Sequence, residues 1–171
     1  NWRRKVGEKE ADRIMNQAST IGTEMHQVLE YAYNGKGYFN DSNEGKQPRM
    51  MAKVILNNLD IDEVWGNEVS LEFENQYAGT CDLVAMAYGK PSIVDFKQAN
   101  RPKKEEWVED YKLQLGAYYL AHKRNYGPIE QGVISICTRS LVYQEFKLSE
   151  ADLSEYGEKF LLRVEQFKKL Q

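Results

Sequence analysis

Two acidic residues and a lysine lie close together in the middle of the sequence. Side chains two positions apart on a β-strand point to the same side, so Asp95 and Lys97 share a face of the strand-like segment 92–97. The preceding strand-like segment contains Asp82. With Gly89-Lys90 as a two-residue hairpin loop, Asp82 lies opposite Lys97 and diagonal to Asp95. The pattern predicts two carboxylates and an ammonium group on one patch.

A third carboxylate, Glu68, joins this patch if residues 74–76 form a three-residue turn, because Glu68 then lies opposite Asp82. The same strand carries Glu72 and Glu74, so a solvent-facing Glu68 is the alternative. Clustered carboxylates repel one another and shift one another's pKa, and a divalent cation relieves that repulsion. Oxygen ligands favour Mg²⁺ or Mn²⁺.

The chemistry expected of such a cation is hydrolysis of a phosphate ester. It binds a phosphate oxygen, lowers the pKa of a water molecule and stabilises the charge of the transition state. Lys97 supplies further positive charge or orients the attacking water. The alternative is an exposed Asp95–Lys97 ion pair, which contributes only ~0–1 kcal/mol. The apolar neighbours of Asp95 argue against exposure, since they indicate a central strand in which unpaired charges are costly.

The elements that position these residues follow from the spacing of the apolar side chains. The chain is expected to form, in order, two helices over 7–33 with a turn at 19–22, a loop over 34–46, a helix over 47–59, three antiparallel strands (68–73, 77–88, 92–97), a helix over 103–126, two strands (132–138, 141–147) and a helix over 149–170. Ser149 is placed to cap the last helix. This order indicates an α/β fold with a mixed central sheet of about five strands flanked by helices.

Composition sets the broad class of the protein. The chain has 171 residues, of which 42% are hydrophobic and 29% charged, and this favours one globular domain. A net charge of −3 argues against a protein coated in positive charge, so any nucleic-acid contact must be local. Cys81 and Cys137 have no metal-binding spacing and are expected to be reduced, buried thiols. The sequence shows no membrane-spanning run or secretory signal, which predicts a soluble, intracellular protein.

Four motifs in this order resemble the PD-(D/E)XK nuclease superfamily, in its RecB-like exonuclease branch, which includes phage exonucleases and the mitochondrial genome-maintenance exonuclease. They are Gly22-Thr23-x-x-His26, Gly79-x-x-Asp82, Asp95-x-Lys97 and Gln114-x-x-x-Tyr118. The resemblance covers roughly residues 20 to 120. It implies a restriction-endonuclease-like core, divided here into a helical part (1–62), a catalytic sheet with its long helix (63–147) and a C-terminal helix (148–171). Each motif alone is weak, whereas four in order are specific.

The resemblance also implies the roles of individual residues. His26, Asp82, Asp95 and the backbone carbonyl of Phe96 would bind Mg²⁺ or Mn²⁺, and Lys97 would be catalytic. Gln114 and Tyr118 would position the scissile phosphate or the lysine. Without the resemblance, His26 is a surface or partly buried histidine, and Gln114 and Tyr118 are a hydrogen-bonded pair on a helix. The four cysteines of iron–sulfur relatives are missing, so no such cluster is expected.

Several positively charged side chains follow the Asp95–Lys97 strand. Arg101, Lys103 and Lys104 would stand at the start of the long helix, where cations oppose the helix dipole unless an anion such as a DNA phosphate is near. Together with Thr23, Gln114 and Tyr118 they are the expected DNA contacts. Trp107 and Tyr111 lie on the same helical stripe as Gln114 and are interpreted as core. The N-terminal helix pair and the Gly- and Asn-rich segment 35–49 are interpreted as an arch or lid through which a strand end passes.

The leading hypothesis is a metal-dependent DNA exonuclease that favours single strands or free ends. A double-strand exonuclease or endonuclease of the same superfamily is the second hypothesis, and a catalytically silent nucleic-acid-binding module is the third. The expected compartment is a bacterial or phage-infected cytoplasm, or the mitochondrial matrix if a targeting segment has been removed. The sequence does not distinguish cleavage polarity, oligomeric state, or a role in repair, recombination or phage genome processing.

Overall fold

The computed structural model describes residues 2–37 and 42–170. Its elements are α1 (Trp2–Val6), α2 (Glu8–Tyr33), α3 (Asn43–Asn58), β1 (Ile61–Phe73), β2 (Tyr77–Ala87), β3 (Lys90–Ala99), the 3₁₀ helix η1 (Glu105–Trp107), α4 (Glu109–Asn125), β4 (Gln131–Thr138), β5 (Tyr143–Ser149) and α5 (Glu150–Lys168). The predicted α/β class with a mixed five-stranded sheet is confirmed. Within the described ranges, no helix is long and apolar enough to cross a membrane.

The five strands lie side by side in chain order, β1-β2-β3-β4-β5. β1, β2 and β3 form an antiparallel meander, as predicted. β3 then runs parallel to β4, because α4 crosses over between them, and β5 returns antiparallel to β4. β3 is therefore a central strand with a partner on each side.

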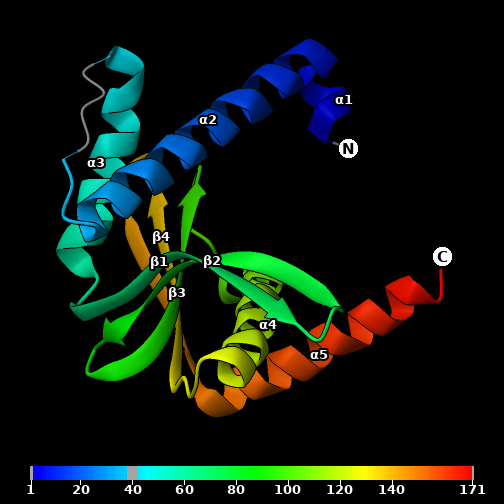
Figure 1. Cartoon of the computed structure of the whole chain (residues 1–171). Coiled ribbons are helices and arrows are strands. Elements are labelled where there is room, and N and C mark those ends of the chain that lie inside the picture. Colours follow the sequence, from blue (N-terminus) through cyan, green and yellow to red (C-terminus); the bar gives the residue numbers. More distant parts are fainter. Residues whose placement is uncertain (1, 38–41, 171) are drawn as a thin grey trace.

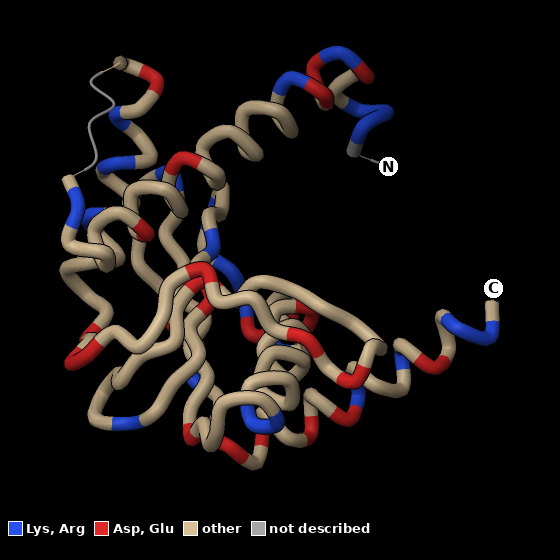
Figure 2. Tube along the Cα trace, viewed as in Figure 1, with Lys and Arg blue, Asp and Glu red and all other residues tan. Residues whose placement is uncertain are grey.

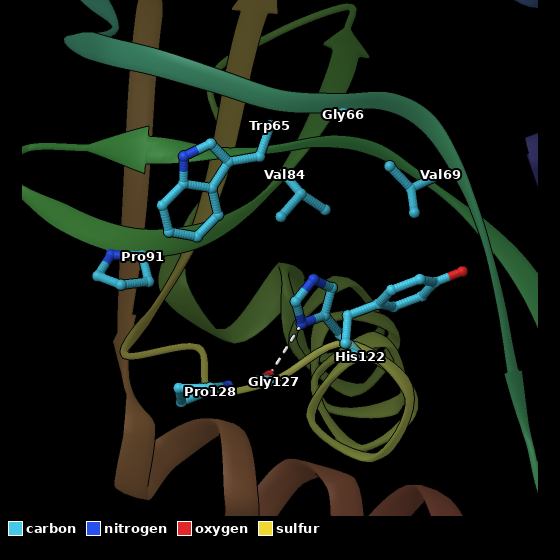
Figure 3. A pocket seen from close by; sticks show the side chains of 9 residues that line it. Trp65, Gly66, Val69, Val84, Pro91, His122, Gly127 and Pro128 are labelled. Atoms are coloured by element: carbon cyan, nitrogen blue, oxygen red, sulfur yellow. Dashed lines mark hydrogen bonds between the residues drawn. The ribbon is translucent and has the colours of Figure 1, made fainter.

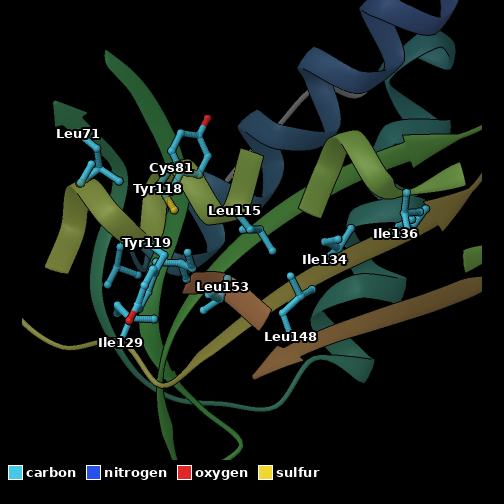
Figure 4. Packing of buried hydrophobic residues seen from close by; sticks show 14 of the residues in the cluster. Leu71, Cys81, Leu115, Tyr118, Tyr119, Ile129, Ile134, Ile136, Leu148 and Leu153 are labelled. Carbon is cyan, nitrogen blue, oxygen red and sulfur yellow. The ribbon is translucent and has the colours of Figure 1, made fainter. Parts of the chain in front are cut away.

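Helices cover both faces of the sheet (Figure 1). On β3, Ile93 packs on the α4 and α5 side, whereas Val94 and Phe96 pack on the α2 and α3 side. This alternation is the period of two expected for a strand buried on both faces. The core on the α4 and α5 side joins Leu115 of α4 and Leu153 of α5 to side chains of the strands (Figure 4).

The turn predicted at residues 19–22 is wrong, because α2 continues through it as one helix. A glycine inside a helix costs about 1 kcal/mol relative to alanine. That cost is offset by burial of Ile21, Met25 and Leu29 against α3 and the sheet. The predicted loop over 34–46 ends earlier, since Ser42 caps α3 by accepting a hydrogen bond from Gly45 N–H. The segment interpreted as an arch includes residues 38–41, which lie outside the described residues.

The predicted register between β2 and β3 is wrong by two residues. Tyr88 and Gly89 form the turn, both with positive φ, so Ala87 pairs with Lys90. A shift of two keeps every side chain on its predicted face, whereas a shift of one would have reversed them. The three-residue turn at 74–76 is confirmed by the pairing of Phe73 with Tyr77.

Of three further predicted details, two are confirmed and one is wrong. Ser149 caps α5 in a reciprocal arrangement with Asp152, as expected. Cys81 and Cys137 are free and buried, also as expected. The helix predicted over 103–126 is wrong at its start, where a short 3₁₀ helix precedes α4.

Candidate active site

Asp82 lies where β2 and β3 separate. The pairing between these strands ends at Leu83 and Val94. Beyond that point, Asp82 Oδ2 accepts a 2.7 Å hydrogen bond from the Phe96 N–H. A side chain thus takes the place of the backbone acceptor that strand pairing would supply. The Asp82 carboxylate is held in the opening between two central strands with 15% of its side chain exposed.

His26 reaches this opening from α2. Its Nε2 atom lies 2.9 Å from the Phe96 carbonyl oxygen and 3.3 Å from Asp82 Oδ2. Its Nδ1 atom lies 2.8 Å from the Gly22 carbonyl oxygen, one turn earlier on the same helix. A neutral imidazole carries only one N–H. Each nitrogen of His26 faces a carbonyl oxygen, which only accepts hydrogen bonds, so the arrangement favours a ring in which both nitrogens carry protons.

The charges around His26 favour this cationic form. Burial acts to lower the pKa of His26. The hydrogen bond and negative charge of Asp82 outweigh burial, helped by the Gly22 carbonyl and the charge of Asp95, and raise the pKa of His26 to about 9. A proton on Nε2 therefore occupies a point surrounded by a ring nitrogen, a carboxylate oxygen and a backbone carbonyl oxygen.

Lys97 and Asp95 form a second polar group on the α4 side of β3. Lys97 Nζ lies 2.6 Å from Asp95 Oδ2 in an ion pair and donates a 3.0 Å hydrogen bond to Gln114 Oε1. Gln114 Nε2 in turn donates a 2.8 Å hydrogen bond to the Tyr118 hydroxyl. This second bond orients the Gln114 amide, so that its oxygen faces the lysine. The Tyr111 ring lies 5.1 Å from Lys97 Nζ.

Asp95 is almost completely buried, with 3% of its side chain exposed. Burial raises its pKa, the charge of Lys97 lowers it and the charge of Asp82 raises it, and the net direction is upward. Among the described residues, Asp95 Oδ2 is a buried oxygen with no partner of hydrogen-bond geometry. The Lys97 ammonium offsets the charge of this buried carboxylate, which would be costly without it, and the oxygen keeps a lone pair that no hydrogen bond uses.

An open cavity of about 430 Å³ lies beside His26 and Asp82. Glu68 lines it, opposite Asp82 and exposed, and the pKa of Glu68 is raised by partial burial and by the charges of Asp82 and Glu30. Thr23, a predicted DNA contact, also lines this cavity. Glu30 and Gln27 line it too, although the sequence assigned them no role. Their signal in the sequence is helical spacing, since Glu30 follows His26 by one turn.

The residues in this opening fit a divalent cation in the nature of their donor atoms. His26 Nε2, Asp82 Oδ2 and the Phe96 carbonyl oxygen surround one point, and the buried Asp95 oxygen lies on the same strand as Phe96. The contact of His26 Nδ1 with the Gly22 carbonyl fixes the orientation of the ring, as such contacts do for histidines that bind metals. Within residues 2–37 and 42–170, no group of three or more His, Cys, Asp or Glu side chains forms a ready-made metal site. The Phe96 carbonyl is a further oxygen donor beside His26 in these ranges.

Gly79, the first residue of the Gly79-x-x-Asp82 motif, lies in close contact with Tyr118. A Cβ atom at this position would lie 3.0 Å from Cε1 of Tyr118. Tyr118 is only 9% exposed and is held by its bond to Gln114. The glycine therefore allows β2 to approach the tyrosine whose hydroxyl bonds Gln114, which in turn holds Lys97.

The positively charged residues after β3 lie in a loop rather than at the start of α4, which corrects the prediction about the helix dipole. The first turn of α4 carries Glu109 and Asp110, as the dipole favours. The interpretation of Trp107 as core is also wrong, since it is 44% exposed. Arg101 Cζ and Lys104 Nζ lie 5.5 and 5.4 Å from the centre of its ring.

A second cavity, of about 410 Å³, lies on the α4 side of the sheet (Figure 3). Trp65, Val69 and Val84 line it together with His122, which the sequence assigned to no site. His122 Nδ1 lies 3.1 Å from the Gly127 carbonyl oxygen. Burial lowers the pKa of His122 despite that bond. No Asp or Glu among the described residues lines this cavity.

Comparisons with known proteins identify a family and a similar solved fold. The family model of the PD-(D/E)XK nuclease superfamily matches residues 44–170. Among solved structures, the chain is similar to a protein named "Putative exonuclease" from Eubacterium rectale, with a TM-score of 0.58 and 14% sequence identity over 87% of this chain and 68% of that chain. This likeness concerns the fold alone. No curated protein matches the chain.

The matched region contains the strands and α4, and with them Asp82, Asp95, Lys97, Gln114 and Tyr118. His26 and Thr23 lie on α2, before the matched region, so their place at the site rests on the geometry described above. The extent of the match shows the family, and the chain belongs to the PD-(D/E)XK nuclease superfamily, whose members hydrolyse phosphodiester bonds.

Proposed function

We propose that this protein is a divalent-metal-dependent DNA exonuclease that acts on single strands or free ends. The observation that carries the proposal is the meeting of two groups where β2 and β3 separate. One group is His26, Asp82 and the Phe96 carbonyl around a common point. The other is the buried Asp95–Lys97 pair. Together they offer ligands for a cation and a fixed positive charge for a phosphate.

His26, Asp82, Asp95 and the Phe96 carbonyl would hold Mg²⁺ or Mn²⁺. Glu68 lines the same cavity and would act at its open side, directly or through water. When bound, the cation supplies a nucleophilic water at neutral pH and charge stabilisation at the phosphate. The proton that His26 Nε2 carries in the metal-free protein would leave on binding, because a ligating imidazole nitrogen must be unprotonated.

Lys97 would act on the scissile phosphate or on the attacking water. Asp95 and Gln114 restrict the position of its Nζ atom, so the ammonium group is already placed before substrate binds. Tyr118 acts through Gln114, whose amide it orients. We infer that Gln114 and Tyr118 are positioning residues that also contact the phosphate backbone.

The distribution of charge supports the proposed preference for single strands or ends. The net charge is −3, and in the view of Figure 2 Lys and Arg are scattered among Asp and Glu along the chain. A small cationic loop at Arg101, Lys103 and Lys104 matches the narrow backbone of a single DNA strand better than the wide surface of a duplex. The solved structure named "Putative exonuclease" has the same fold, which supports action at ends.

Digestion of end-labelled DNA tests the proposal. Single- and double-stranded oligonucleotides labelled at the 5′ or 3′ end are incubated with Mg²⁺, Mn²⁺ or EDTA, with closed circular DNA in parallel. We expect metal-dependent shortening of linear single strands and no cutting of circles. Cutting of circles would indicate an endonuclease, and no cleavage with either metal would overturn the assignment.

A further inference from the structure

We propose that Trp107 is a stacking platform for an unpaired nucleobase of single-stranded DNA, with Arg101 and Lys104 binding the phosphates beside it. This inference deepens the proposed function and rests on it for the identity of the nucleic acid. The unusual feature is a tryptophan with 44% of its surface exposed on the loop that directly follows the Asp95–Lys97 strand. Exposed indole surface beside cations is the composition by which proteins hold single strands.

The cations belong to the same small cluster as the ring. The Arg101 guanidinium and the Lys104 ammonium lie 5.5 and 5.4 Å from the ring centre, within cation–π range. Lys104 is loosely held, since its ion pair with Glu106 measures 3.9 Å and both side chains are 66% exposed. A base can therefore take a place on the indole while these cations move to the adjacent phosphates.

The loop that carries the cluster is fixed before any ligand binds. Lys103 N–H donates a 2.6 Å hydrogen bond to Gln144 Oε1, and Gln144 Nε2 donates a 2.9 Å bond to the Lys103 carbonyl. Trp107 N–H donates a 2.9 Å bond to the Lys104 carbonyl. A preorganised loop loses little conformational entropy on binding, which favours affinity.

The cluster is also continuous with the active site. Arg101 follows Lys97 by four residues, a reach of at most about 14 Å for an extended chain. The ring of Tyr111, four residues after Trp107, has its centre 5.1 Å from Lys97 Nζ. A single DNA strand whose scissile phosphate lies at Lys97 would therefore place one of its next bases at Trp107. Bases in a duplex are stacked on each other, so the platform selects unpaired ones.

Binding of a fluorescein-labelled oligothymidylate in EDTA tests this inference without any cleavage. Replacing Trp107 with Ala should weaken binding about tenfold, and Trp107→Phe should recover most of the affinity, because base–aromatic stacking is lost and then restored. Trp65→Ala is the matched control, since Trp65 is 46% exposed but lies at the second cavity. It should bind like the wild type. Thermal unfolding of each variant checks the fold.

Two further measurements separate stacking from a general loss of affinity. An abasic site moved along the oligonucleotide should weaken wild-type binding at one position, and Trp107→Ala should remove that dependence. Arg101→Gln should lower the slope of log affinity against log salt by about 0.7, the value for one single-strand phosphate contact. Lys90→Gln, at the other end of β3, should leave the slope unchanged.

The inference is overturned if Trp107→Ala binds as tightly as the wild type, if a blunt duplex loses as much affinity as the single strand, or if Trp107→Phe restores nothing. These failures differ from failure of the proposed function. A wild type that binds single strands through Trp107 but cuts no DNA would overturn the nuclease proposal alone. Cleavage by a protein whose Trp107→Ala variant binds normally would overturn the platform alone.

Discussion

The two histidines of this chain lie beside two cavities of similar volume and have opposite properties. His26 opens on a cavity of about 430 Å³ that is lined by Glu30, Glu68 and Asp82. His122 opens on one of about 410 Å³ that is lined mainly by apolar side chains (Figure 3). Each ring has Nδ1 near a backbone carbonyl oxygen. The pKa of His26 is raised to about 9, whereas the pKa of His122 is lowered.

The difference between them comes from the surrounding carboxylates. Burial lowers the pKa of both imidazoles, and Asp82 reverses that effect at His26 alone. His26 can therefore exchange a proton for a cation at a point where oxygen ligands converge. His122 stays neutral and contributes to packing. The charges that face a histidine in a cavity, and not the volume of that cavity, make it a candidate metal ligand.

The largest expected effect comes from Lys97→Ala. Removing a positive charge placed at the phosphate should lower the rate of DNA cleavage by about 10²–10³-fold or more, while metal binding and the fold persist. Lys90→Ala, at the start of the same strand and before Pro91 of the second cavity, should cut DNA at the wild-type rate. Single-turnover cleavage and calorimetric metal titration measure both properties. Wild-type turnover by Lys97→Ala would show that Lys97 takes no part in the cleavage reaction.

Replacing each histidine with glutamine tests the comparison directly. His26→Gln should raise the Mg²⁺ or Mn²⁺ concentration needed for half-maximal cleavage by at least about tenfold, because a ligand is lost. His122→Gln should leave that concentration unchanged and lower the free energy of unfolding by about 1 kcal/mol, through the lost bond to Gly127. Equal effects of the two substitutions on metal dependence would break the comparison.

The two histidines should also give stability opposite dependences on pH. The pKa of His26 is raised, so its stabilising effect is present below its ordinary value of 6.5 and lost as pH rises from there to about 9. The pKa of His122 is lowered, so its folded, neutral form is stable above that value and is destabilised on acidification. Urea unfolding in EDTA between pH 5 and pH 9, with the free energy of unfolding extrapolated linearly to zero urea, measures both slopes.

Single substitutions assign each pH slope to its residue. His26→Gln should flatten the loss of stability above pH 6.5, and His122→Gln should flatten the loss at acid pH. Apparent metal affinity of the wild type should rise with pH by about tenfold per unit until His26 is deprotonated, because metal and proton compete for Nε2. A metal affinity independent of pH would exclude His26 from the ligand set.

The smallest expected effect comes from Gly79→Ala. The added methyl group would press on Tyr118 at 3.0 Å and shift the hydroxyl that orients Gln114. We expect a loss of about 1 kcal/mol in the free energy of unfolding and a smaller loss of cleavage rate than for Lys97→Ala. Gly22→Ala, where a Cβ meets open space within a helix, should instead stabilise the protein by about 0.5–1 kcal/mol. Unfolding in urea and initial rates of cleavage measure these changes.

Much of the fold could be predicted from the sequence because apolar periodicity is a local property. The order of strands in the meander, the Ser149 cap and the three-residue turn before Tyr77 are examples. The errors occurred where tertiary packing outweighs local preference. α2 continues through Gly22 because its apolar face is buried, and the hairpin turns at Tyr88-Gly89 because strand pairing selects positive φ at both residues.

The sequence by itself determined which residue types face each side of β3, and therefore that Asp95 and Lys97 stand together, because the period of two fixes side-chain direction along a strand. Only the tertiary structure decided that Asp82 bonds the Phe96 N–H where β2 leaves β3, and that His26 reaches the same point from a helix 70 residues away. It also decided that Trp107 is exposed beside Arg101 rather than buried. Contacts of this kind depend on how distant elements pack, and no local pattern encodes that packing.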